Sequence, residues 1–174
     1  MIVYVCRHAS AGPRRENARR DELRPLDARG QQQARHMGTA LAMLGIGLNV
    51  ILSSPLKRAT QTAALIASEL GYQGRWELEA ALRPEADFSG FRAMLARYSG
   101  YEAVLVVGHK PSLPASLGRL LGAQRAVVEL KKGAIAKIEV DGQRTRLVWL
   151  LTPSLVQQLQ SRTIAKSKPK TARK

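Results

Sequence analysis

The chain has 174 residues, of which 45% are hydrophobic and 24% are charged, a composition that favours one globular domain over a disordered segment. Lysine and arginine outnumber aspartate and glutamate by 28 to 13, and the formal net charge of +15 favours anionic partners. The sequence has no apolar run long enough to cross a bilayer and no signal-peptide pattern, so we expect a cytoplasmic protein without a membrane partner.

The first half of the chain alternates apolar strands with amphipathic helices. Asp27 is a predicted N-cap and Gly71 a predicted helix end, and Cys6, the one cysteine, is expected to be a buried, inert thiol. The predicted order is strand 2–7, a charged loop at 12–25 with room for a helical turn, helix 27–44, strand 49–54 and helix 55–70.

The second half ends in a hairpin, for which residues 141–143 supply the turn. The predicted order is connection 75–87, helix 88–98, strand 102–109, helix 111–121, and strands 126–130, 134–140 and 145–151. This order predicts an α/β fold: a three-layer sandwich with a mostly parallel central sheet flanked by helices and with antiparallel strands late in the chain.

The last residues differ in composition from the rest of the chain. Residues 161–174 contain six lysines and arginines and no acid, and the rest of the chain keeps a charge of +9. We therefore predict one domain over residues 1–160, followed by a basic, disordered tail over residues 161–174.

Three apolar strands end in side chains that can bind an anion. The first ends in Arg7 and His8, the second is followed by Ser54 and then Arg58, and the third ends in His109. Each of these side chains alone is more often a surface charge or a hydrogen-bonded core residue. Because the carboxyl ends of parallel strands meet at one edge of a sheet, where ligands bind, we expect them to converge.

These groups share the chemistry that recognises a tetrahedral dianion. Arginine makes paired hydrogen bonds to phosphate oxygens, and a helix N-terminus adds free N–H groups. A neutral imidazole is a competent nucleophile toward phosphorus, and the small residues 9–11 leave room for a phosphoryl group. The three motifs contain no carboxylate, so we predict no metal site. His36 lies in a predicted helix outside any motif and is assigned no role.

Four motifs resemble those of the histidine phosphatase superfamily. They are RHA at residues 7–9, RPLDARG at 24–30, SSPLKRATQTA at 53–63 and VVGHKP at 106–111. The resemblance spans residues 1 to about 153 and implies a phosphoglycerate mutase-like fold, with residues 1–160 as the histidine phosphatase domain. The short chain and the RHA motif resemble the SixA-type phosphohistidine phosphatases within this superfamily.

The resemblance also implies roles for the residues that match its motifs. His8 would be the nucleophile that forms a transient phosphohistidine, and Arg7 and Arg58 would hold the phosphoryl oxygens. His109 would be a further phosphate ligand that stabilises charge in the transition state. The implied enzyme is a hydrolase of phosphoric monoesters or phosphoramidates that uses no cofactor.

Two serines and one tautomer complete the expected site. Ser10 and Ser54 would add hydrogen bonds to the phosphoryl group, although a turn or helix cap explains Ser54 equally well. We expect a backbone carbonyl to hold one ring N–H of His8, which would fix its tautomer and leave the other nitrogen free to attack.

The proton donor for the leaving group is the one part without a clear match. Many superfamily members use a carboxylic acid after the second helix, and Glu79, Glu85 and Asp87 are candidates by region only. Ala80 and Ala81 stand where related chains often have a Pro-Glu pair. A general acid typically contributes ~10²–10⁴ in rate, and an imidazole leaving group needs this help far less than an alkoxide does.

These observations favour a metal-independent phosphatase whose substrate is a phosphohistidine-bearing phosphotransfer or signalling protein. The first alternative is a phosphatase of small esters, such as a sugar phosphate or a phosphoglycerate derivative. The second is a non-catalytic module that binds phosphate or nucleic acid. Aromatic residues are only 5% of the chain, so we expect no nucleic-acid contact beyond non-specific binding by the basic tail.

Overall fold

The computed structural model describes residues 1–142 and 144–167, and for residues 162–167 it describes the backbone only. Its strands are β1 (Ile2–Arg7), β2 (Val50–Ser53), β3 (Arg75–Leu78), β4 (Ala103–Gly108), β5 (Ile135–Asp141) and β6 (Arg144–Leu151). Its helices are α1 (Ala18–Glu22), α2 (Ala28–Met43), α3 (Lys57–Leu70), the short 3-10 helix η1 (Ala80–Leu82), α4 (Phe88–Arg97), α5 (Ser112–Leu120) and α6 (Pro153–Ser167).

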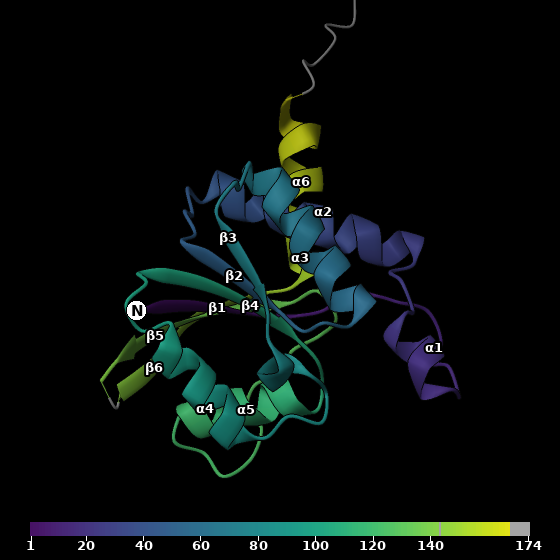
Figure 1. Cartoon of the computed structure of the whole chain (residues 1–174). Coiled ribbons are helices and arrows are strands. Elements are labelled where there is room, and N and C mark those ends of the chain that lie inside the picture. The colour runs from purple at the N-terminus through teal and green to yellow at the C-terminus, as the bar shows by residue number, and fades with distance from the viewer. Residues whose placement is uncertain (143, 168–174) are drawn as a thin grey trace, which may run out of the picture.

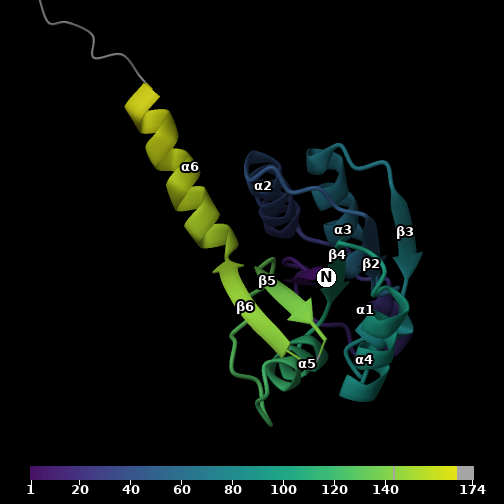
Figure 2. The same cartoon turned by 90° about the vertical axis from the view of Figure 1, so that its left-hand side faces the viewer.

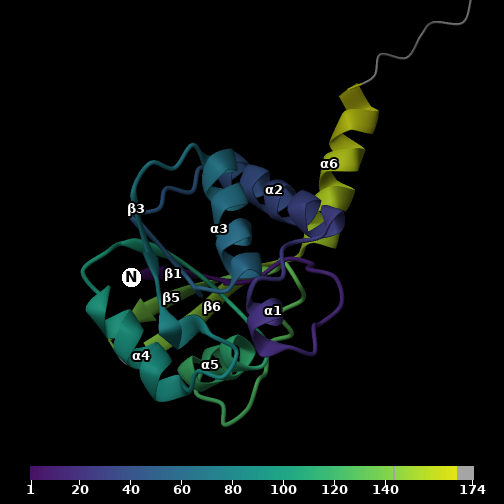
Figure 3. The same ribbon diagram turned by 45° about the vertical axis from the view of Figure 1, so that its right-hand side comes forward.

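One sheet in the order β3-β2-β4-β1-β5-β6 forms the middle layer. Strands β3, β2, β4 and β1 are parallel, whereas β5 is antiparallel to both β1 and β6. Helices α2 and α3 cover one face and α4 and α5 cover the other, as Figure 1 and Figure 3 show. The predicted sandwich, with a mostly parallel sheet and late antiparallel strands, is confirmed.

Strand β1 shows how the sequence pattern builds both halves of the core. Val3 and Val5 belong to the cluster that packs against α4 and α5, whereas Tyr4 and Cys6 belong to the cluster under α2 and α3. Successive side chains of a strand point to opposite faces, so a strand buried on both faces is apolar throughout. Burial raises the pKa of the Cys6 thiol to about 12, as expected of an inert core cysteine.

Three elements differ from the sequence-based expectation. Residues 75–78 form β3 instead of a connection, and residues 126–130 are irregular instead of forming a strand. β3 is a mostly exposed edge strand without an apolar pattern. In 126–130, Val127 is 56% exposed while Leu130 packs into the core. Helix α6 follows the last strand where no helix was expected, whereas the short helix α1 agrees with the helical turn expected in the charged loop.

Helix α6 crosses the predicted boundary between domain and tail. It begins at Pro153 and runs through Ser167, and Figure 2 shows it extending away from the sheet. Residues 168–174 of the predicted tail, and residue 143 of the hairpin turn, lie outside the described residues. In the described ranges, α6 included, we find no helix that combines the length and apolarity needed to cross a bilayer.

We expect Leu105→Ala to lower the free energy of unfolding by about 2–5 kcal/mol, because Leu105 is fully buried in the central strand β4 and its loss would leave a cavity. Met43→Ala, at a side chain that is 75% exposed, is the control, with an expected change within about 0.5 kcal/mol. Urea unfolding followed by circular dichroism measures both. Equal effects of the two substitutions would contradict this assignment of the core.

Candidate active site

Backbone pairing brings the three strand ends together at one edge of the sheet. β4 lies between β1 and β2, and the ladders continue past the last strand residues. The His8 amide donates to the Gly108 carbonyl at 2.9 Å, and the Ser54 amide donates to the Val107 carbonyl at 2.9 Å. His8, Ser54 and His109 therefore follow three adjacent strands at the same level.

A pocket of about 500 Å³ opens at this edge, and we call it the reaction pocket. Its described lining contains six arginines and lysines but only two carboxylates, so it favours an anion. It also brings together five of the predicted site residues from distant parts of the chain. The lining residues are Arg7, His8, Gly12, Arg14, Asp21, Arg24, Arg58, Pro84, Glu85, His109, Lys110, Pro111 and Lys132.

His8 is held as a neutral imidazole with one nitrogen available. Its Nδ1 lies 2.7 Å from the Ala9 carbonyl oxygen, which can only accept, so Nδ1 holds the hydrogen and Nε2 keeps a lone pair. Burial, together with the positive charges of Arg58 and Arg7, lowers the pKa of His8 to about 3. The hydrogen bond to Ala9 acts in the opposite direction and raises the pKa, but by less than burial lowers it. The expected tautomer is present, and the ring is uncharged at neutral pH.

His109 lies beside His8, with 4.9 Å between the ring centroids. Its Nε2 is 2.8 Å from the Ser54 hydroxyl oxygen, so Ser54 orients the ring from a fully buried position. Burial, followed by repulsion from His8 and Arg58, lowers the pKa of His109 to about 2. Both histidines are therefore neutral before an anion enters.

Three residues that line this pocket each have a buried nitrogen without a hydrogen-bond partner. These nitrogens are Arg7 Nε, Arg58 Nε and His109 Nδ1, and within the described part of the chain the buried side chains show no other unpaired nitrogen or oxygen. In both arginines the unpaired nitrogen is Nε, whereas Nη1 holds the side chain in place. Nη1 of Arg7 donates to the Leu130 carbonyl at 3.0 Å, and Nη1 of Arg58 donates to the Asp21 carbonyl at 2.8 Å. An unpaired buried polar group costs about 1–3 kcal/mol, so an anion with several oxygens fits this arrangement.

Asp27 explains the motif at residues 24–30. Its Oδ2 accepts hydrogen bonds from the Ser10 hydroxyl and the Gly12 amide, both at 2.8 Å, and its Oδ1 caps α2 through the Gly30 amide at 2.7 Å. A Cβ at position 30 would lie 1.9 Å from the Ser10 carbonyl oxygen, so only glycine fits there. The motif therefore fixes the loop that follows His8.

Arg24 lines the reaction pocket, although the sequence analysis gave it no role in binding the phosphoryl group. One of its Nη atoms donates to the Ala11 carbonyl at 2.6 Å and to the Gly12 carbonyl at 3.0 Å, while its Nε donates to Asp21 at 2.8 Å. Its position at the start of the RPLDARG motif was the available signal. Arg24 thus lines the reaction pocket and also braces the loop after the nucleophile candidate.

The two predicted serines have different partners in the structure. Ser54 contacts His109, and its hydroxyl also accepts a hydrogen bond from the Leu56 amide at 3.4 Å, so it both orients the histidine and caps a turn. The Ser10 hydroxyl is bound to Asp27, and Ser10 lines a neighbouring pocket instead of the reaction pocket.

Of the three carboxylates considered as proton donors, only Glu85 lines the reaction pocket. Both oxygens of Glu79 accept from Arg97 at 2.7 Å. Asp87 caps α4. The hydrogen bond from Arg83 lowers the pKa of Glu85, which keeps that carboxyl ionised. Across the described ranges, no cluster of three or more His, Cys, Asp or Glu side chains could hold a metal ion.

Comparison with known proteins agrees with the motifs. The family profile of the histidine phosphatase superfamily (branch 1) matches residues 3–92. The chain is 27% identical over 143 residues to the phosphohistidine phosphatase SixA of Escherichia coli, and the match covers 81% of this chain and 86% of that protein.

Solved structures show the same fold. The protein histidine phosphatase SixA complexed with tungstate aligns with a TM-score of 0.81 and 25% identity, over 90% of this chain and 99% of that one. A phosphoglycerate mutase from Bacillus anthracis aligns with a TM-score of 0.73 and 16% identity, over 92% and 96% of the two chains. The expected phosphoglycerate mutase-like fold is confirmed.

We expect Asp27→Asn to lower the free energy of unfolding by about 1–3 kcal/mol at pH 7, because an amide cannot replace both acceptor oxygens. Although burial raises the pKa of Asp27, hydrogen bonds from Ser10, Gly30 and Gly12 lower it overall. A carboxyl with a lowered folded pKa stabilises above its unfolded pKa of about 3.9 and loses this contribution as the pH falls through the folded value. In urea unfolding, the difference in free energy of unfolding between the wild type and Asp27→Asn should therefore be constant from pH 8 to 5 and shrink below about pH 4. A difference independent of pH would contradict this role.

We expect the rings of His8 and His109 to stay neutral from pH 8 to 5, since their pKa values are lowered to about 3 and about 2. Inorganic phosphate should raise the pKa of His109, because a bound dianion offsets the repulsion by Arg58. Nitrogen-15 NMR of the imidazoles measures both effects. A titration midpoint for His8 between pH 6 and 7 in the phosphate-free protein would refute the assigned environment.

Proposed function

The chain belongs to the histidine phosphatase superfamily, and on this basis we propose that it is a metal-independent phosphatase that forms a phosphohistidine intermediate on His8 and acts on protein phosphohistidine. The single observation that best supports this proposal is the set of unpaired nitrogens on Arg7, Arg58 and His109, three residues that line the reaction pocket together with the neutral imidazole of His8. A phosphoryl group supplies several acceptor oxygens, and its phosphorus is the electrophile that the free Nε2 requires.

In the first proposed step, Nε2 of His8 attacks phosphorus, a nitrogen–phosphorus bond forms and the bond to the leaving group breaks. Arg7 and Arg58 hold the phosphoryl oxygens as the negative charge spreads over them. His109 contributes a donor if the Ser54 hydroxyl donates to its Nε2, because the ring hydrogen then lies on the unpaired Nδ1. The hydrogen bond between His8 Nδ1 and Ala9 stabilises the positive charge that develops on the attacking ring.

In the second proposed step, water attacks the phosphorus of phosphorylated His8. The nitrogen–phosphorus bond breaks, inorganic phosphate leaves, and His8 returns to the neutral form with its Nδ1 hydrogen still bound to Ala9. The same two arginines serve this step, because the phosphoryl oxygens stay in the reaction pocket while phosphorus transfers. Positioning and charge stabilisation thus account for the catalysis, without a cofactor.

The leaving group supports the choice of substrate. The two carboxyls in the described lining of the reaction pocket, Glu85 and Asp21, both have a lowered pKa and are poorly suited to protonate an alkoxide at neutral pH. A phosphohistidine substrate releases imidazole, which is a far better leaving group. The similarity to SixA supports the same choice, and a small phosphate ester is the alternative that the following experiment tests.

We expect His8→Ala to abolish turnover and covalent labelling. Rapid quench into base with a phosphorus-32-labelled phosphohistidine protein should trap a base-stable, acid-labile phosphate on the wild-type chain in the presence of EDTA. Arg58→Ala should lower kcat/KM by about 10²–10³, and Arg58→Lys by less, because lysine keeps the charge but loses the paired geometry. Arg35→Ala, at an exposed position on α2, is the control.

A substrate panel tests the preferred substrate. It contains a phosphohistidine phosphotransfer protein, several sugar phosphates, a phosphoglycerate and 4-nitrophenyl phosphate. A kcat/KM highest for the phosphoprotein supports protein phosphohistidine, and one highest for a small ester replaces it with the alternative. Full turnover by His8→Ala would end the proposed mechanism for every substrate.

A further inference from the structure

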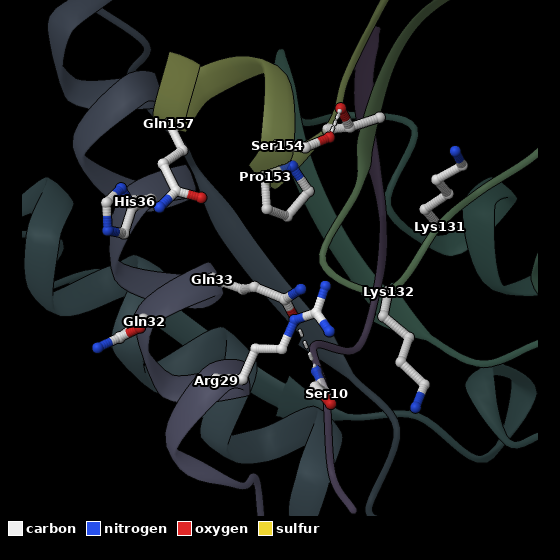
Figure 4. Close-up of a pocket in the computed structure, with 11 residues that line it drawn as sticks. Ser10, Arg29, Gln32, Gln33, His36, Lys131, Lys132, Pro153, Ser154 and Gln157 are labelled. Carbon is white, nitrogen blue, oxygen red and sulfur yellow. Dashed lines mark hydrogen bonds between the residues drawn. The ribbon is translucent and has the colours of Figure 1, made fainter. Parts of the chain in front are cut away.

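A second pocket, of about 360 Å³, lies next to the reaction pocket, and we call it the flanking pocket. It lies between α2, the loop before β5 and the first turn of α6 (Figure 4). Lys132 lines both pockets, and Ser10 lines the flanking pocket only two residues after His8. The two pockets are therefore neighbours that share a wall.

The flanking pocket has an excess of positive charge. Arg29, Lys131 and Lys132 line it, and within the part of the chain that the structure describes none of these side chains has an ion pair or a hydrogen bond. Its described lining contains no aspartate or glutamate. Asp27 lies close enough to feel Lys132, but its two oxygens already accept three hydrogen bonds. Three cations without a partner beside a cavity favour an anionic ligand.

Neutral donors complete the same wall. The Gln33 side-chain oxygen accepts from the Ser10 amide at 3.0 Å, so its NH₂ group is left to donate elsewhere. Figure 4 shows Arg29 and Gln33 extending from α2 toward Ser10 and Lys132. Thr152 and Ser154, at the start of the 15-residue helix α6, line the opposite side, where the positive end of the helix dipole adds to the side-chain charges.

The loop before β5 links the two pockets physically. The Leu130 carbonyl anchors Arg7 in the reaction pocket, while the next two residues, Lys131 and Lys132, line the flanking pocket. The Gly133 amide then donates to the carbonyls of Arg7 and His8 at 3.0 and 3.2 Å. A ligand that contacts this loop from the flanking pocket therefore lies beside the backbone that holds the nucleophile.

We propose that the flanking pocket binds a second anionic group, a phosphate or a carboxylate, of the same molecule whose phosphoryl group enters the reaction pocket. The identity of that molecule rests on the proposed function. The substrate class is thus a phosphorylated molecule with a further acidic group near the scissile bond. A substrate with only one anionic group would leave Arg29 and Lys131 without a partner.

Inhibition of 4-nitrophenyl phosphate hydrolysis tests this proposal. The measured quantity is the ratio of the inhibition constant of a monophosphonate to that of the bisphosphonate of equal length. Alkane-α,ω-bisphosphonates with two to six methylene groups are compared with alkyl monophosphonates of equal length at 0.15 M salt. We expect at least one bisphosphonate to bind about three- to tenfold more tightly than its monophosphonate, after a factor of two is divided out for its two equivalent ends, because two exposed charge pairs together contribute about this much. A matching series of ω-carboxyalkyl phosphonates shows whether phosphate or carboxylate is preferred.

Arg29→Gln combined with Lys131→Gln should reduce this ratio to about one. Lys132 is left unchanged because it lines both pockets. The control with the same loss of charge is Arg35→Gln combined with Arg92→Gln, two exposed arginines outside both pockets, and it should keep the wild-type ratio. Equal ratios in the two double variants, or a ratio of one for every linker in the wild type, would overturn the proposal.

A binding measurement separates this proposal from the proposed function. Inorganic phosphate titrated into the nitrogen-15-labelled protein should shift the amides of Ser154 and Leu155 and the side-chain NH₂ of Gln33 in a saturable way. The shifts should be lost in Arg29→Gln/Lys131→Gln and kept in Arg35→Gln/Arg92→Gln. Shifts without enzymatic turnover would reject the proposed function and keep the anion site, whereas shifts that persist in the first variant would reject the anion site.

Discussion

The structure depends on one electrostatic constraint, the gathering of cationic and donor groups at a buried sheet edge with too few acceptors to satisfy them. Arg7 and Arg58 are each anchored through one nitrogen to a backbone carbonyl, which leaves other nitrogens unpaired beside two neutral histidines. Packing alone does not favour such an arrangement, because unpaired buried donors cost free energy. The fold sustains it through the apolar strands β1, β4 and β2, whose burial on both faces stabilises the edge where the charges lie.

A second layer of contacts holds this edge in place and involves no reacting group. Asp27 fixes the loop after His8 through Ser10 and Gly12, and Arg24 fixes the same loop through two carbonyls. Ser54 does the same for His109 from the end of β2. The motifs read in the sequence therefore contain two kinds of residue: those that line the reaction pocket and those that keep the first kind in register.

The sequence predicted the parts of the molecule in which a local pattern and a tertiary role coincide. Buried strands are apolar throughout, helices start at Asp27 and end at Gly71, and the end of β1 pairs with the end of β4 as a parallel sheet requires. It failed where tertiary context decides. β3 pairs as a strand although its side chains are mostly exposed, and the segment 126–130 buries the side chain of Leu130 without forming a strand. The sequence could not show which carboxylate after α3 lies in the reaction pocket, because this depends on tertiary contacts. Glu79 accepts hydrogen bonds from Arg97, whereas Glu85 lines the pocket.

The contact between Gly30 and Ser10 has a mechanical consequence. Because no side chain fits between them, α2 meets the loop after the nucleophile backbone against backbone, with no compressible layer of rotamers to absorb a displacement. Helix α2 also packs against α6. A displacement of the first turn of α2 would therefore be transmitted directly to the backbone of the loop that follows His8.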